Sequence, residues 1–155
     1  MKSSFIIIVG LITFVTIYFI YLSIKSHSGS PIGLINQKLS PCPDKPNCIN
    51  SEFKNDTTHF VDAMTYQDKS TDEVIHAIER VIQKTGGEIA TINEKYIAAT
   101  YKSKLFRFID DLEIRLDDND KLIHFRSASR VGRSDLGINI KRVNLIKTEL
   151  GIQLH

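Results

Sequence analysis

An uncharged apolar run near the N-terminus constrains this chain more than any other feature of its sequence. Residues 5–24 read FIIIVGLITFVTIYFIYLSI, twenty residues without a charged side chain. As a helix rising about 1.5 Å per residue, the run would be about 30 Å long, which matches the hydrocarbon core of a bilayer. The alternative is a cleaved signal peptide, whose apolar region is usually shorter, about 7–15 residues. We therefore expect an uncleaved transmembrane anchor.

The charges that flank this run decide its orientation by a narrow margin. Lys2 and the terminal amine precede it, and Lys25 and Lys38 follow it. Positive side chains favour the cytoplasmic side of a membrane, and an anchor with its N-terminus inside leaves the rest of the chain outside. We expect a single-pass protein of the inner or plasma membrane with its domain on the extracytoplasmic side, which in a bacterium is the periplasm.

The chain beyond the anchor divides into a linker and one domain. Residues 25–40 contain Gly29, Pro31 and Gly33 without an apolar period, which is typical of a flexible spacer. Residues 41–155 can bury one core, and a content of 42% hydrophobic and 25% charged residues is that of a globular protein. Because the formal net charge is only +2, we expect no nucleic-acid partner.

Two helices are predicted within the domain. Ser70 and Glu73 form a capping box, and apolar side chains then recur at helical spacing until Gly86-Gly87 ends the helix. A second amphipathic helix follows at residues 140–150.

Alternating apolar and polar residues predict strands. The clearest case is a hairpin in which residues 112–116 and 123–127 flank a turn; one face is expected to pack on the core and the other, polar, face to meet solvent. Further strands are predicted at residues 59–66, 88–92 and 95–101. The order β-α-β-β-β-β-α predicts an α+β domain, an antiparallel sheet of about five strands with two helices on one face, preceded by one N-terminal transmembrane helix.

Two cysteines, Cys42 and Cys48, are separated by a short segment that includes two prolines. Outside the cytoplasm this spacing favours a structural disulfide, which would contribute about 2 kcal/mol by restricting the unfolded chain. The alternatives are a pair of free thiols and a redox or metal site. A redox pair more typically has two intervening residues, and a metal site would need two further ligands, of which only His59 is near in sequence.

Asp110, Asp111 and His124 form a candidate polar network in the predicted sheet. The two aspartates are adjacent and therefore face opposite sides of an extended strand, so they cannot act as a paired acid and base. Asp110 is in phase with the apolar face, where a carboxylate requires a partner; an arginine further along the chain could supply it. His124 is expected to form a surface pair with Glu113 across the hairpin.

A basic segment connects the last predicted strand to the last helix. Residues 126–142 carry a local net charge of +4, whereas residues 44–94 carry −5. Arginine side chains and backbone N–H groups before a helix suit an anionic small molecule, a lipid headgroup or an envelope protein. The alternative is a structural loop in which Asp135 or Asn139 caps the helix. The candidate ligand-binding residues are Arg107, Arg126, Ser127, Ser129, Arg130, Ser134, Asp135, Asn139 and Arg142.

Common catalytic motifs are absent from the sequence. It contains no phosphate-binding glycine loop, no dinucleotide fingerprint, no His-Glu-x-x-His and no serine elbow, so no catalytic residue, metal ligand or cofactor is predicted. We expect a non-catalytic membrane-anchored domain that binds an anionic ligand or a protein partner through the basic segment. The alternative is a cell-envelope enzyme in which Asp110, Asp111, His124 or Asp135 acts as acid or base.

Three stretches resemble a known family. They are residues 42–48 (CPDKPNC), 103–113 (SKLFRFIDDLE) and 126–139 (RSASRVGRSDLGIN) with Lys141-Arg142. Together they resemble the domain of unknown function 1499 family, found mainly in bacteria and in plants, over nearly all of the chain after the linker. The chain departs from the family pattern at Lys45 and Asn50, where members often carry Ser, and at Lys104, where they often carry Arg; a lysine there cannot make a bidentate anion contact. The resemblance implies no reaction, substrate or cofactor.

Overall fold

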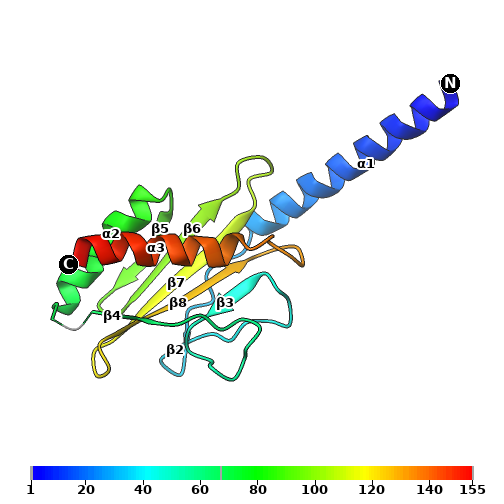
Figure 1. Ribbon diagram of the computed structural model, residues 1–155. Coiled ribbons are helices and arrows are strands. Elements are labelled where there is room, and N and C mark those ends of the chain that lie inside the picture. Colours follow the sequence, from blue (N-terminus) through cyan, green and yellow to red (C-terminus); the bar gives the residue numbers. More distant parts are fainter. Residues whose placement is uncertain (1, 67, 155) are drawn as a thin grey trace.

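The structure, a computed structural model, describes residues 2–66 and 68–154 (Figure 1); the predicted domain end at residue 155 lies outside them. Its helices and strands are α1 (Lys2–His27), β1 (Leu34–Ile35), β2 (Lys38–Leu39), β3 (Cys48–Asn50), β4 (Met64–Thr65), α2 (Thr71–Lys84), β5 (Glu88–Asn93), β6 (Tyr96–Lys102), β7 (Ile109–Asp117), β8 (Leu122–Ser129) and α3 (Ile138–Leu154). From β4 to α3 this is the predicted order.

The predicted α+β fold is confirmed. A six-stranded sheet has the order β3-β8-β7-β6-β5, with β4 beside β8, and the paired strands are antiparallel. Within this sheet the strand that the prediction lacks is β3, which pairs with β8 through residues that show no alternation. The first predicted strand, residues 59–66, is shorter than expected and is reduced to β4.

Helices α2 and α3 lie side by side on one face of the sheet (Figure 1). The predicted capping box of α2 is present: the Ser70 hydroxyl accepts from the Glu73 N–H, and the Glu73 carboxylate accepts from the Ser70 N–H. The core between helices and sheet includes Ile78, Phe125 and Ile146. One face of the sheet is therefore apolar and closed by helices, as the sequence predicts.

The opposite face of the sheet is also covered, so the prediction that it meets solvent is wrong. Glu113 of β7 and Arg126 of β8 are buried there. Leu39, at the end of the β1–β2 hairpin, is fully buried and packs with Tyr96 and Ala98 on this face. The cover comes from a distant part of the chain, since the residues in contact are as much as 80 positions apart. No local pattern in the sequence indicates such a contact.

Helix α1 extends beyond the apolar run at both ends. Within residues 2–66 and 68–154 it is the one helix that is long and apolar enough to cross a membrane. Hydrogen bonds join it to the domain: the Ile109 N–H donates to the Ser26 hydroxyl (3.2 Å), and Nη1 of Arg130 donates to the Ser26 carbonyl (3.1 Å). Residues 25–40, predicted as a flexible spacer, contain the last turn of α1 and the β1–β2 hairpin.

Candidate functional site

A groove of about 600 Å³ lies where α1 meets the end of the sheet. Its walls come from α1, from the β6–β7 loop (residues 103–108) and from the β8–α3 loop (residues 130–137). We call it the juxtamembrane groove. Its main apolar lining residues are Phe19, Leu22, Phe108, Val131, Leu136 and Ile138. An apolar recess of this size at the end of a helix that could cross a membrane is the leading candidate site.

Asp110 and Arg142 line the groove as a largely buried ion pair, with side chains 13% and 10% exposed. Nη2 of Arg142 donates to the Asp110 carboxylate (2.7 Å), and Nη1 donates to the side-chain carbonyl of Asn139 (2.6 Å). The guanidinium also lies over the Tyr101 ring, 4.5 Å from its centroid. Arg142 is thus fixed in position, and Asp110 has the arginine partner that its place on the apolar face requires.

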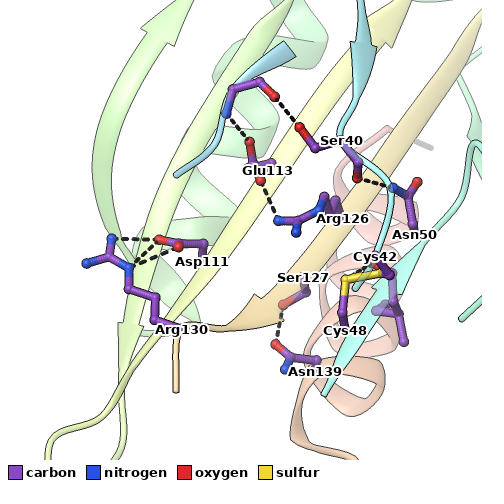
Figure 2. A network of polar contacts seen from close by, with 12 residues as sticks. Ser40, Cys42, Cys48, Asn50, Asp111, Glu113, Arg126, Ser127, Arg130 and Asn139 are labelled. Atoms are coloured by element: carbon purple, nitrogen blue, oxygen red, sulfur yellow. Dashed lines mark hydrogen bonds and ion pairs between the residues drawn. A yellow bond between two sulfur atoms is a disulfide. The ribbon is translucent and has the colours of Figure 1, made fainter. Parts of the chain in front are cut away.

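Asn139 connects the groove to the segment between the cysteines. Its Oδ1 accepts from the Ser127 hydroxyl (2.6 Å, Figure 2), and its Nδ2 donates to Ser129 Oγ (3.1 Å) and to the Asn47 carbonyl (3.0 Å). The N-terminus of α3 is capped by Asp135, whose carboxylate accepts from the Asn139 N–H (2.7 Å). Ser127 and Asn139 are therefore buried structural groups, with Asp135 as the cap.

Glu113 and Arg126 form a buried pair beneath the β1–β2 hairpin. Nη1 of Arg126 donates to Oε2 of Glu113 (2.7 Å), and Oε1 accepts from the Tyr96 hydroxyl (2.7 Å) and the Gly33 N–H (2.8 Å). In Figure 2 the carboxylate lies between Arg126 and the covering backbone. Burial, together with the bond to Glu113, raises the pKa of Tyr96, so its hydroxyl remains a donor. Arg126 therefore holds the cover in place and does not face a ligand.

Arg130 joins the sheet to the anchor. Nε and Nη2 donate to both carboxylate oxygens of Asp111 (2.7–3.1 Å, Figure 2), and Nη1 donates to the carbonyls of Ser26 and Gly29. With Arg126 and Arg142 also paired, three arginines of the basic segment are neutralised by carboxylates. The exposed basic side chains at this end of the domain include Lys104, Arg107, Arg133 and Lys141.

The predicted ligand-binding residues fall into two groups. The first lines the juxtamembrane groove and consists of Ser129, Ser134, Asp135 and Arg142. The second lies outside it and consists of Arg107, Arg126, Ser127, Arg130 and Asn139. The sequence analysis missed Phe19 and Leu22, because residues within a uniformly apolar run carry no signal that they also line a site in the domain.

The candidate polar network does not form one cluster. Asp110 and Asp111 point to opposite faces, toward Arg142 and Arg130 respectively. The predicted pair of His124 with Glu113 is wrong, because the four-residue turn between β7 and β8 sets a register in which His124 lies opposite Arg115. These side chains are therefore not arranged for joint acid–base chemistry.

A second, polar cavity of about 470 Å³ contains His124. The Nδ1 atom of His124 lies 3.1 Å from the Ser51 hydroxyl oxygen, which also accepts from the Phe125 N–H (2.8 Å). Burial lowers the pKa of His124. The cavity also contains the ion pair of Glu52 with Arg115. Ser51 was missed because it is 73 positions from His124 and belongs to no recognisable motif.

The predicted disulfide is confirmed: Cys42 and Cys48 are bonded, with their Cα atoms 5.7 Å apart. Such a bond indicates an oxidising compartment. No group of three or more metal-ligating side chains occurs in the part of the chain that the structure describes. The disulfide loop also presents the Asn47 carbonyl to Asn139, so it supports the start of α3.

Comparison with models of protein families identifies the family of this chain. A family model described as "Protein of unknown function (DUF1499)" covers residues 38–150, which is more than half of the chain. Comparison with curated proteins finds no match. The matched region begins close to the predicted domain start at residue 41. It includes β7 and β8, which carry the three carboxylates that pair with arginines and one of those arginines, Arg126.

Proposed function

We propose that this chain, which belongs to the DUF1499 family, is a membrane-anchored protein whose extracytoplasmic domain binds an anionic lipid in the juxtamembrane groove. The apolar helix α1 supports the anchor, and the disulfide supports an oxidising compartment. The proposal keeps the anionic ligand that the sequence favours. It moves the contact from Arg126 and Arg130, which hold carboxylates, to the groove.

The observation that carries the proposal is the shared wall of the groove. Phe19 and Leu22 belong to the apolar run of α1 and also line the groove. Phe19 lies five residues before Ile24, the end of that run, so at about 1.5 Å per residue it is about 7–8 Å inside the apolar segment. A groove at this depth opens toward lipid tails and can receive an acyl chain directly from the bilayer.

The chemistry of the lining suits an amphiphile better than a free anion. Burying apolar surface contributes about 25 cal/mol per Å², which favours an acyl chain along Phe108, Val131 and Ile138. The Lys104 side chain lines the same groove and is exposed, so it can meet a charged headgroup. The enzyme alternative has less support, because His124 lies in a different cavity from Asp110 and Asp135, and the acids Asp110 and Asp111 are paired with arginines.

Native mass spectrometry of the full chain, extracted from its own membranes in mild detergent, tests the proposal. Ile138→Trp enlarges a side chain that lines the groove, whereas Ile140→Trp makes the same change two residues later, at a similarly exposed site outside it. We expect wild type and Ile140→Trp to retain a bound lipid, and Ile138→Trp to lose it with an unchanged melting temperature. Equal lipid binding by both variants, or none by wild type, would contradict the proposal.

A further inference from the structure

We infer that the β6–β7 loop and Leu136 of the β8–α3 loop insert into the headgroup layer of the bilayer beside α1. This inference rests on α1 crossing the membrane and is independent of any ligand in the groove. The partner is therefore the lipid surface around the anchor, and the domain rests on that surface instead of hanging from a flexible tether.

The aromatic contacts between loop and anchor fix the depth of the β6–β7 loop. The Phe106 ring stacks on Phe19 with centroids 4.6 Å apart, and the Phe108 ring lies 6.0 Å from Phe19. If residues 5–24 span the hydrocarbon core, Phe19 is inside its boundary. A ring stacked on Phe19 must then lie at a similar depth, just inside the boundary, close to the interface where aromatic side chains are enriched.

Two leucines at this end of the molecule contact little protein. Leu105 is 81% exposed and Leu136 is 87% exposed, and they belong to the two loops that wall the groove. Leu136 also has a φ of +55°, which a branched side chain rarely adopts. A single exposed leucine is ordinary, but these two lie near the apolar surface of α1. Leu136 lines the groove together with Phe19, and Leu105 precedes Phe106, whose ring stacks on Phe19.

Exposed basic residues lie close to both leucines in the sequence. Lys104 and Arg107 flank Leu105, and Arg133 precedes Leu136; all three are exposed. Apolar tips within a basic rim are typical of segments that lie in the membrane interface, where the cations meet anionic headgroups. The nearest acid in the β8–α3 loop, Asp135, is used as the cap of α3.

The hydrogen bonds at the end of α1 keep these loops at the membrane. The Ser26 hydroxyl accepts from the Ile109 N–H, and the Ser26 carbonyl accepts from Arg130. The His27 ring donates to the Arg107 carbonyl (2.9 Å). The loop therefore keeps its depth relative to the helix.

Fluorescence quenching on the full chain in vesicles of phosphatidylcholine and phosphatidylglycerol tests the inference. Since Cys42 and Cys48 are bonded, one introduced cysteine can be labelled selectively with an environment-sensitive dye under non-reducing conditions. Leu105→Cys and Leu136→Cys report the two loops. Asn119→Cys, in the exposed β7–β8 turn at the other end of the sheet, is the control.

We expect the labels at 105 and 136 to be quenched by lipids with brominated acyl chains and shielded from aqueous iodide, with the reverse at 119. Iodide quenching at 105 or 136 as strong as at 119 would overturn the inference. Because this readout requires no ligand, its failure is distinguishable from loss of the lipid in the Ile138→Trp experiment.

Discussion

The carboxylate of Glu113 and the guanidinium of Arg126 lie 2.7 Å apart in an ion pair of which neither side chain is more than 4% exposed. The pair lies on the sheet face away from the helices, under the β1–β2 hairpin. The other carboxylate oxygen of Glu113 accepts from the Gly33 N–H in the covering segment. This arrangement turns a face that would be solvated in a simple two-layer domain into a second buried layer, connected directly to the anchor.

The first prediction concerns this pair. Glu113→Gln leaves the Arg126 charge buried without a counter-charge, so we expect the free energy of unfolding to fall by about 3–5 kcal/mol. The control is Glu88→Gln, which removes the partner of Lys102 from a pair whose glutamate side chain is 68% exposed. Exposed pairs contribute about 0–1 kcal/mol. Denaturant unfolding of the full chain in detergent measures both, and equal losses would show that burial of the pair is unimportant.

The second prediction concerns the joint between anchor and domain. Arg130→Ala removes the groups that bind Asp111 and the carbonyls of Ser26 and Gly29. We expect amide hydrogen exchange in residues 26–33 to become about tenfold faster or more, since about 1.4 kcal/mol of lost local stability is a tenfold change. Arg133→Ala, in the same loop but exposed, should leave exchange unchanged. Similar exchange in both variants would mean that Arg130 does not hold the segment.

The third prediction concerns the disulfide. Replacing Cys42 and Cys48 by serine should lower the free energy of unfolding by about 2 kcal/mol, the value for closing so short a loop. Reduction of the wild-type protein should give a similar loss. Thiol labelling of unreduced protein in intact cells supplies a separate check, because readily alkylated cysteines would place the domain in a reducing compartment.

The fourth prediction concerns pH. Burial lowers the pKa of His124 below its unfolded value of about 6.5. Above that value the residue is neutral in both states; as the pH falls through it, the unfolded chain binds the proton first, so the protein loses stability. We expect the fall in unfolding free energy from about pH 7 to about pH 5 to be smaller in His124→Gln than in wild type. Parallel curves for the two proteins would refute this.

Local sequence signals predicted the elements but not the second buried layer. The capping box of Ser70 and Glu73 and the alternation in β7 and β8 depend on neighbouring residues only. They correctly predict the start of α2 and the two strands. Glu113 has a partner in the covering segment, and Arg130 has one in α1, and both partners are 80 or more positions away. Their side chains look like exposed charges in the sequence, because nothing nearby indicates that a distant segment covers them.

The candidate site shows the same division. The sequence indicated the region around the β8–α3 loop, and four of the nine predicted ligand-binding residues line the groove. It favoured Arg126 and Arg130 because they are basic residues in a polar segment, and only the fold reveals that each already holds a carboxylate. Phe19 lines the groove because α1 packs against the β6–β7 loop, where its ring stacks on Phe106. No periodicity in the sequence predicts that contact.

Lipid binding in the groove is tested most directly by photo-crosslinking in native membranes. A photoactivatable phenylalanine analogue at Val131, which lines the groove, is compared with the same residue at Ile92, an exposed position on β5. After irradiation, mass spectrometry of the peptides should show a lipid attached at position 131 and none at position 92. Position 131 without lipid, or equal attachment at both positions, would contradict a lipid-binding groove.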